Sequence, residues 1–135
     1  DLSAPIMAPS MAAPSLDDLV AHLDEPFSHA LFQFIDAKGK TDVEVYKRAN
    51  IDRRLFSKIR SVHGYTPKKP TILALAVALE LSLPETDKLL ERAGYALSHA
   101  SKFDVIVEYF IVNGKYNIFD INEVLFQYDQ PLLGA

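Results

Sequence analysis

The sequence predicts an all-α fold, because its apolar residues recur at helical intervals and its segments carry helix-stop signals. Between Leu16 and Leu23, leucine and valine follow one another at intervals of three and four residues, which places them on one face of a helix. Gly39 and Gly94 stand where two such patterns end. Apolar residues make up 49% of the chain, enough for a hydrophobic core. We therefore expect a bundle of about five helices followed by a C-terminal helical extension.

Composition divides the chain into four expected segments. Residues 1–14 are rich in Ala, Pro, Ser and Met and show no apolar period, so they are predicted to be a flexible linker or tail. Residues 15–26 are expected to form a short helix, capped by Ser15 and ended near Pro26. Residues 27–100 are predicted to hold the main helical domain, and residues 101–135 the extension. Because the chain lacks an initiator Met and opens on this linker, we expect it to be a piece of a longer protein.

A helix-turn-helix pattern occupies Thr41–Arg60. Thr41 is a favourable helix cap, and Glu44 three residues later completes the sequence of a capping box. Asn50 can adopt the left-handed conformation that a tight turn needs. Asp52 is then placed to cap the second helix of the pair. We therefore expect two short helices separated by a tight turn, with the second helix outward-facing and basic.

The segments after this pattern are also predicted to be helical. Thr71–Leu81 is nearly all apolar, so this helix should be central in the bundle. Pro84 is placed to begin the next helix, and Asn117–Tyr128 shows helical spacing again. Residues 101–113 leave two interpretations open, because their apolar residues have helical spacing but the run VIVEYFIV is β-branched enough for a strand.

The charge of the chain is strongly segregated. The net charge is −4, yet residues 38–69 hold ten Lys or Arg against three acidic residues, a local net charge of +7. Residues 1–37 hold six acidic residues and no Lys or Arg. The excess positive charge therefore lies on the helix-turn-helix pattern, where it indicates either an ordinary solvated face or a surface for a polyanion.

Several classes of site find no support in the sequence. The chain has no cysteine, which excludes disulfides, thiol catalysis and cysteine zinc sites and is compatible with a reducing cytoplasm. Its four histidines lie in different segments without metal-ligand spacing, so we expect no metal, no cofactor and no small-molecule substrate. No catalytic constellation is recognisable, and no signal peptide or membrane-spanning run is present. We expect a non-enzymatic, cytoplasmic protein.

The segment Thr41–Tyr95 resembles the lambda-repressor-like (XRE-type) helix-turn-helix family. In that family the helix after the turn enters the major groove of double-stranded DNA. The resemblance therefore implies a DNA-binding module that regulates transcription. It rests on Thr41, Val45, Ala49, Ile51, Phe56, Ser57 and Ile59 and on the run LALAVALELSLPETDKLLERAGY. It implies base contacts from Arg53, Arg54, Ser57 and Lys58, and phosphate contacts from Lys47, Arg48, Arg60, Lys68 and Lys69.

Three positions depart from the family pattern. Asp42 stands where the family usually has a neutral Gln, and its carboxylate is expected to face the DNA backbone and repel it. Tyr46 replaces a small residue between the two helices, and Asn50 replaces the turn glycine. The pattern of residues 27–135 is also similar to a helix-turn-helix tail of some bacterial multidomain proteins, which implies a DNA-targeting part of a larger protein.

The C-terminal extension suggests a second kind of function. Its apolar residues cover more than one helix face, so we expect part of them to form a surface for a homodimer or a protein partner, and the rest to pack on Phe27–Ala37. The candidate interface residues are Phe119, Phe126 and Tyr128. The alternative to DNA binding is therefore an adaptor in which the helix-turn-helix serves only as a scaffold.

Overall fold

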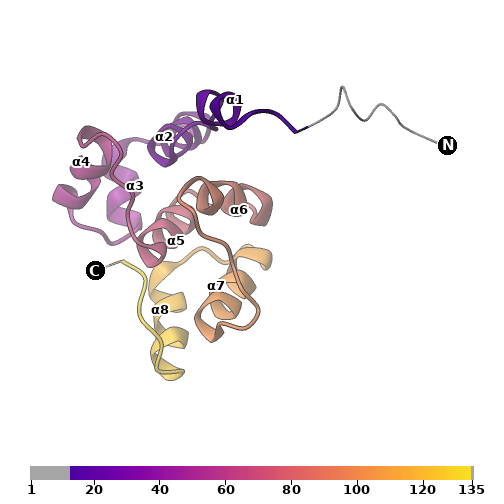
Figure 1. Ribbon diagram of the computed structural model, residues 1–135. Coiled ribbons are helices and arrows are strands. Elements are labelled where there is room, and N and C mark those ends of the chain that lie inside the picture. The colour runs from indigo at the N-terminus through magenta and orange to yellow at the C-terminus, as the bar shows by residue number, and fades with distance from the viewer. Residues whose placement is uncertain (1–12, 135) are drawn as a thin grey trace.

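The computed structural model describes residues 13–134, and all regular structure in this range is α-helical (Figure 1). The expected all-α class is confirmed, and residues 102–112 form a helix rather than a strand. Most of the predicted 1–14 linker lies outside the described residues. The eight helices of the described range are α1 (Leu16–Ala21), α2 (Phe27–Ala37), α3 (Asp42–Arg48), α4 (Arg53–Ser61), α5 (Lys69–Ala78), α6 (Leu83–Arg92), α7 (Lys102–Val112) and α8 (Ile118–Gln127).

Helix α5 lies at the centre of the bundle, as its composition predicts. Every side chain from Ile72 to Ala78 is buried, so this helix has no face for solvent. A helix that is apolar on all sides must be enclosed by other elements. Helices α3, α6 and α8 all pack against α5 and supply that enclosure.

Helices α3 and α4 begin and turn as their sequence predicts. The Thr41 hydroxyl accepts a hydrogen bond from the Glu44 N–H at 3.2 Å, and the Glu44 carboxylate accepts one from the Thr41 N–H at 2.9 Å. The second bond is the main cause that lowers the pKa of Glu44. Asn50 has a φ of 55°, which is the left-handed conformation expected there. Asp52 accepts from the Arg54 N–H at 2.8 Å and caps α4.

An aromatic cluster joins α2, α3 and α4. Phe56 contacts Phe32 edge-on, with ring centroids 5.9 Å apart. It also contacts the ring of Tyr46 at 5.7 Å. Aromatic pairs at such separations are favourable beyond the area they bury. Tyr46, which departs from the small residue of the family pattern, therefore helps to hold α3 against α4.

The C-terminal extension packs on α5 and α6, so the expectation that it packs on Phe27–Ala37 is wrong. Helix α7 lies against α6 and α8, and α8 lies against α5. Buried Val107, Ile121 and Leu125 extend the one hydrophobic core that begins at Phe27. The reason is that apolar side chains point from α5 in every direction. Helix α8 covers the side of α5 that α3 and α6 leave open. The spacing of apolar residues in the sequence identifies the apolar face of a helix, but it does not identify the helix against which that face packs.

The residues after α8 return to the turn between α3 and α4. Leu133 is 1% exposed, and its backbone N–H and C=O bond to the Asn122 side chain at 2.7 and 2.9 Å. Gly134 has a φ of +77°, and a Cβ at this position would lie 2.6 Å from the carbonyl oxygens of both Ala49 and Asn50. Only glycine allows this close approach of two backbones. The tail thereby contacts the helix-turn-helix turn directly.

Asn50 yields a test of this local structure. Asn50→Ala should lower the free energy of unfolding by about 1–2 kcal/mol, because a Cβ with no compensating polar group is strained at positive φ. Asn50→Gly should have a free energy of unfolding no lower than that of the wild type, because glycine adopts positive φ without strain. Urea denaturation followed by far-UV circular dichroism measures both. Gln33→Ala, at an exposed position of α2, is the control, and equal stability of the two Asn50 variants would contradict the role of the left-handed turn.

Candidate nucleic-acid interface

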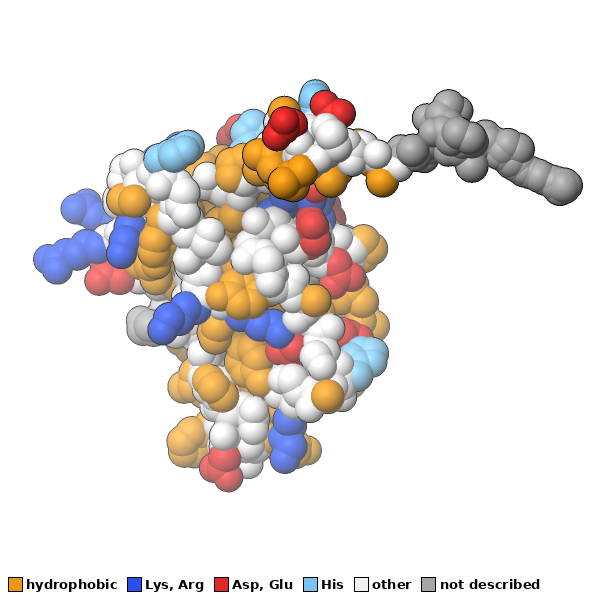
Figure 2. All heavy atoms as spheres, viewed as in Figure 1, with side chains coloured by type: hydrophobic (Ala, Val, Ile, Leu, Met, Phe, Trp, Pro, Cys, Tyr) orange, Lys and Arg blue, Asp and Glu red, His pale blue; other side chains and the backbone are white. Residues whose placement is uncertain are grey.

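Helix α4 presents its basic residues to solvent at the edge of the molecule. Arg53 and Arg54 form its first turn, and Ser57 and Lys58 lie one turn later; all four side chains are exposed. The buried face of the same helix is formed by Phe56 and Ile59. Figure 2 shows Lys and Arg side chains projecting from the edge where α4 lies in Figure 1. The structure therefore places the four predicted base-contacting residues together on one accessible helix.

Five of the nine predicted DNA-contacting residues are cations with no ion-pair partner. Within residues 13–134, no carboxylate oxygen lies within 4.0 Å of their charged nitrogens. Unpaired cations carry a field into solvent that a polyanion can neutralise. The five are Lys47, Arg53, Arg54, Lys58 and Lys68.

Arg60 is engaged by residues of two other helices. Its guanidinium donates to the Asp42 carboxylate at 2.8 Å and lies over the ring of Phe32, 3.9 Å from the centroid. The pair joins the start of α3 to the end of α4. The negative charge of Asp42, expected to repel DNA, is thus offset by an arginine 18 residues away. Arg60 in turn would have to leave Asp42 to contact a phosphate.

Lys69 and Arg48 are also paired. The Lys69 ammonium lies 2.5 Å from the carboxylate of Asp104, whose side chain is 2% exposed. Asp104 also accepts from the backbone N–H of Ser98 at 2.8 Å, so this site joins the start of α5 to the start of α7. Arg48 lies 3.7 Å from Glu80. Both cations are less available to an external anion than the five unpaired ones.

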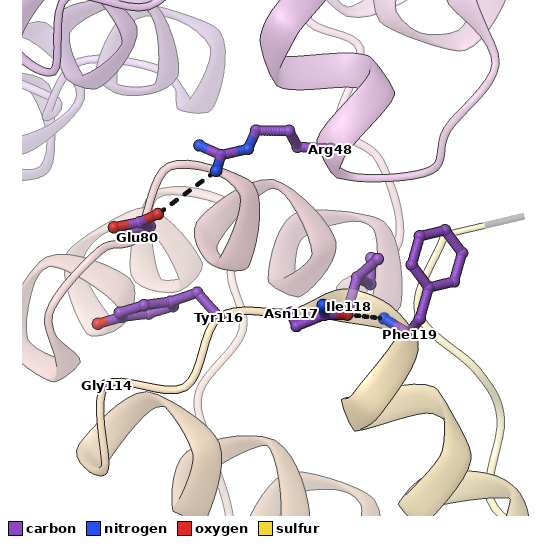
Figure 3. Close-up of a pocket in the computed structure, with 7 residues that line it drawn as sticks. All are labelled: Arg48, Glu80, Gly114, Tyr116, Asn117, Ile118 and Phe119. Carbon is purple, nitrogen blue, oxygen red and sulfur yellow. Dashed lines mark hydrogen bonds and ion pairs between the residues drawn. The ribbon is translucent and has the colours of Figure 1, made fainter.

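A polar hollow of about 380 Å³ lies beneath Arg48, and the sequence alone did not predict it (Figure 3). It is bounded by the α3 end, the α5–α6 turn and the α7–α8 loop. The Tyr116 hydroxyl donates to the Leu81 carbonyl at 2.8 Å and points away from Arg48. Burial is the main cause that raises the pKa of Tyr116. Arg48 and Glu80 form an ion pair, so together they add no net charge to the hollow.

The three predicted interface residues are exposed. Phe119 is 67% exposed, Phe126 73% and Tyr128 52%. Phe119 and Phe126, seven residues apart, share one face of α8. Tyr128 projects from a different face, beside α7, where it lines an apolar groove with Tyr109. The extension therefore carries two separate apolar surfaces.

Neither similarity to known proteins nor a metal site or membrane span points to another function for the described residues. Comparison with protein-family models, curated proteins and solved structures finds no match in any of the three. Among residues 13–134, no group of three or more His, Cys, Asp or Glu side chains is placed to hold a metal ion. No helix of that same range is long and apolar enough to cross a membrane.

The Asp42–Arg60 pair generates a test of the candidate interface. Asp42→Asn should tighten binding to duplex DNA at low salt, because it removes a carboxylate and releases an arginine for a phosphate. The slope of log K against log salt concentration should become more negative by about 0.9, which corresponds to one additional phosphate contact. Fluorescence anisotropy with a labelled duplex measures both quantities.

The control is the same substitution in an Arg60→Ala background, where the steeper slope should be absent. An affinity that does not change when Asp42 is replaced would show that this end of α3 lies away from the DNA.

Proposed function

We propose that this protein is a non-enzymatic DNA-binding module, used for transcriptional regulation or as the DNA-targeting part of a larger bacterial protein. The observation that supports the proposal most directly is the set of unpaired cations on α4 and its flanks. Three of them, Arg53, Arg54 and Lys58, lie on the outward face of a short helix that follows a tight turn, and Lys47 and Lys68 flank that helix. The resemblance of residues 41–95 to the lambda-repressor-like family gives the same function.

The proposed binding mode places α4 in the major groove. An α-helix fits the width of that groove, and residues in its first turn come nearest to the base edges. Arg53 and Arg54 would then donate to guanine, for which arginine has matching bidentate geometry. Lys47 precedes the turn and Lys68 precedes α5, so both flank α4 and would contact phosphates.

The charge of the remaining chain supports a single orientation on DNA. Residues 1–37 hold six acidic and no basic residues, and residues 102–135 hold five acidic residues against two lysines. These segments repel a phosphate backbone, whereas the segment around α4 attracts it. The protein would therefore approach DNA with the α4 face forward.

A salt titration tests DNA binding. Affinity for duplex DNA should fall linearly on a log–log scale with a slope of about −0.9 for each phosphate contacted, since each contact releases a counterion. Fluorescence anisotropy from low to physiological ionic strength measures the slope. Absence of duplex binding even at low salt would remove the proposal.

Matched variants separate base contacts from phosphate contacts. Arg53→Ala and Arg54→Ala should each cost about 1–3 kcal/mol on a preferred sequence, selected from a random duplex library, and should relax base preference. Lys68→Ala should weaken binding to all duplexes alike. Identical behaviour of the three variants would mean that binding is not sequence-specific.

A second candidate function, protein interaction, is favoured by the outer face of α8. Two phenylalanines more than two-thirds exposed are unusual on a helix whose opposite face is fully buried. Aromatic residues are enriched at the centres of protein interfaces, where they supply contact area with little loss of side-chain entropy. We propose that Phe119 and Phe126 contact a protein partner.

Substitution of Phe126 tests whether this face is free for a partner. Phe126→Asp should change the free energy of unfolding by no more than about 0.5 kcal/mol, as for other exposed positions. Leu125→Asp, one residue earlier and fully buried, should lose about 4 kcal/mol or more, because it buries a charge. Chemical denaturation compares them. A loss at Phe126 as large as that at Leu125 would assign Phe126 to the core, and a partner captured by both wild type and Phe126→Asp would place the contact elsewhere.

A further inference from the structure

Helix α1 carries an apolar stripe that nothing in the described chain covers. Leu16 is 74% exposed, Leu19 54%, Val20 59% and Leu23, just past the helix end, 76%. No residue of α1 is buried. Leu16, Leu19 and Val20 follow the i, i+3, i+4 pattern by which an amphipathic helix anchors in an apolar groove, and Leu23 adds apolar surface beyond the helix end.

The stability of α1 also calls for a partner. The helix has six residues, and isolated helices shorter than about 12–15 residues are marginal in water. Its cap is good, since Ser15 accepts from the Asp18 N–H at 3.1 Å. A cap supplies hydrogen bonds to backbone N–H groups but buries no side chain. Burial of the apolar stripe therefore requires another apolar surface of similar size.

An apolar groove of suitable character lies between α7 and α8. It encloses about 300 Å³ and is lined by Val105, Ile106, Tyr109, Phe110, Val124 and Tyr128. All six lining side chains are aliphatic or aromatic. Tyr109 is 56% exposed and Val105 44%, so the groove is open to a ligand. It lies on a different side of α8 from Phe119 and Phe126.

Length and charge match the stripe to the groove. The six residues of α1 span about 9 Å, close to the distance along α7 from Lys102 to Tyr109. Lys102 lies at one end of the groove, with its ammonium 5.8 Å from the centroid of the Tyr128 ring. The first turn of α1 carries Asp17 and Asp18, and α1 has no basic residue in its last turn. With the α1 start beside Lys102, opposite charges meet.

Helix α1 cannot reach the groove of its own chain. Figure 1 shows α1 at one end of the bundle and α7 and α8 at the other. Only a short segment joins α1 to α2, and ion pairs hold that segment to α6: Asp24 to Arg92 at 3.5 Å and Glu25 to Lys88 at 3.8 Å. A groove that fits α1 must therefore be supplied by another molecule.

We propose that α1 of one copy binds in the α7–α8 groove of a second copy, and that the exchange is reciprocal. Each subunit then contributes one helix and one groove, and the two equivalent contacts close a twofold dimer. This self-association uses neither the α4 face nor the outer face of α8, so it stands or falls independently of DNA binding.

Mass measurement of the full chain and two variants tests the exchange. The wild type should be a dimer by size-exclusion chromatography with light scattering in the micromolar range. Leu19→Glu, which damages the helix, and Tyr109→Glu, which damages the groove, should each be monomeric. An equimolar mixture of the two variants should recover dimer mass when its concentration is raised, because the intact helix of one binds the intact groove of the other and forms one of the two contacts.

Controls separate this arrangement from other contacts. Phe126→Glu, on the opposite side of α8, and Val43→Glu, on α3, should both remain dimeric, and far-UV circular dichroism should show an unchanged fold for all four variants. A monomeric wild type, a mass above the dimer, or a variant mixture that stays monomeric would each overturn the exchange. So would loss of the dimer in Phe126→Glu with its retention in Tyr109→Glu, which would assign the contact to the outer face of α8.

Discussion

The enclosure of α5 is the constraint on which the rest of the structure depends. Its residues from Ile72 to Ala78 are all buried, so water must be excluded from every side of the helix. Helix α3 covers one side and thereby fixes where the turn and α4 lie. Helices α6 and α8 cover the others. The C-terminal extension is thus part of the same core as the helix-turn-helix pair, and removal of α8 would expose the apolar surface of α5 to water.

Polar contacts between distant segments align these helices. Lys69 and the nearly buried Asp104 join the starts of α5 and α7, and Tyr116 bonds the α7–α8 loop to the Leu81 carbonyl. At the far end, Gly134 lets the C-terminal tail approach the backbone of the α3–α4 turn. The turn that positions the proposed DNA-contacting helix is therefore supported by both its own left-handed Asn50 and the last described residues of the chain.

Ion pairs divide the basic segment into two groups with different consequences for function. Arg48, Arg60 and Lys69 are held by carboxylates of other elements. The remaining cations around α4 carry the excess charge of the segment into solvent, and the proposal of DNA binding rests on them. The two apolar surfaces of α8 and the uncovered stripe of α1 are separate from this face, so association with a protein and with DNA need not compete.

The sequence by itself determined the local structure of this protein. The capping box at Thr41 and Glu44, the cap at Asp52 and the left-handed turn at Asn50 were all predicted, because each depends on hydrogen bonds and sterics within a few residues. The central position of α5 was predicted from its composition. The DNA-contacting role of α4 stays a prediction. Only the tertiary structure decided that Arg60 pairs with Asp42, that Lys69 pairs with Asp104, and that the extension packs on α5 and α6 instead of α2. These contacts join residues 18 and 35 positions apart, and the spacing of apolar or charged residues along a chain defines a face without defining what lies against it.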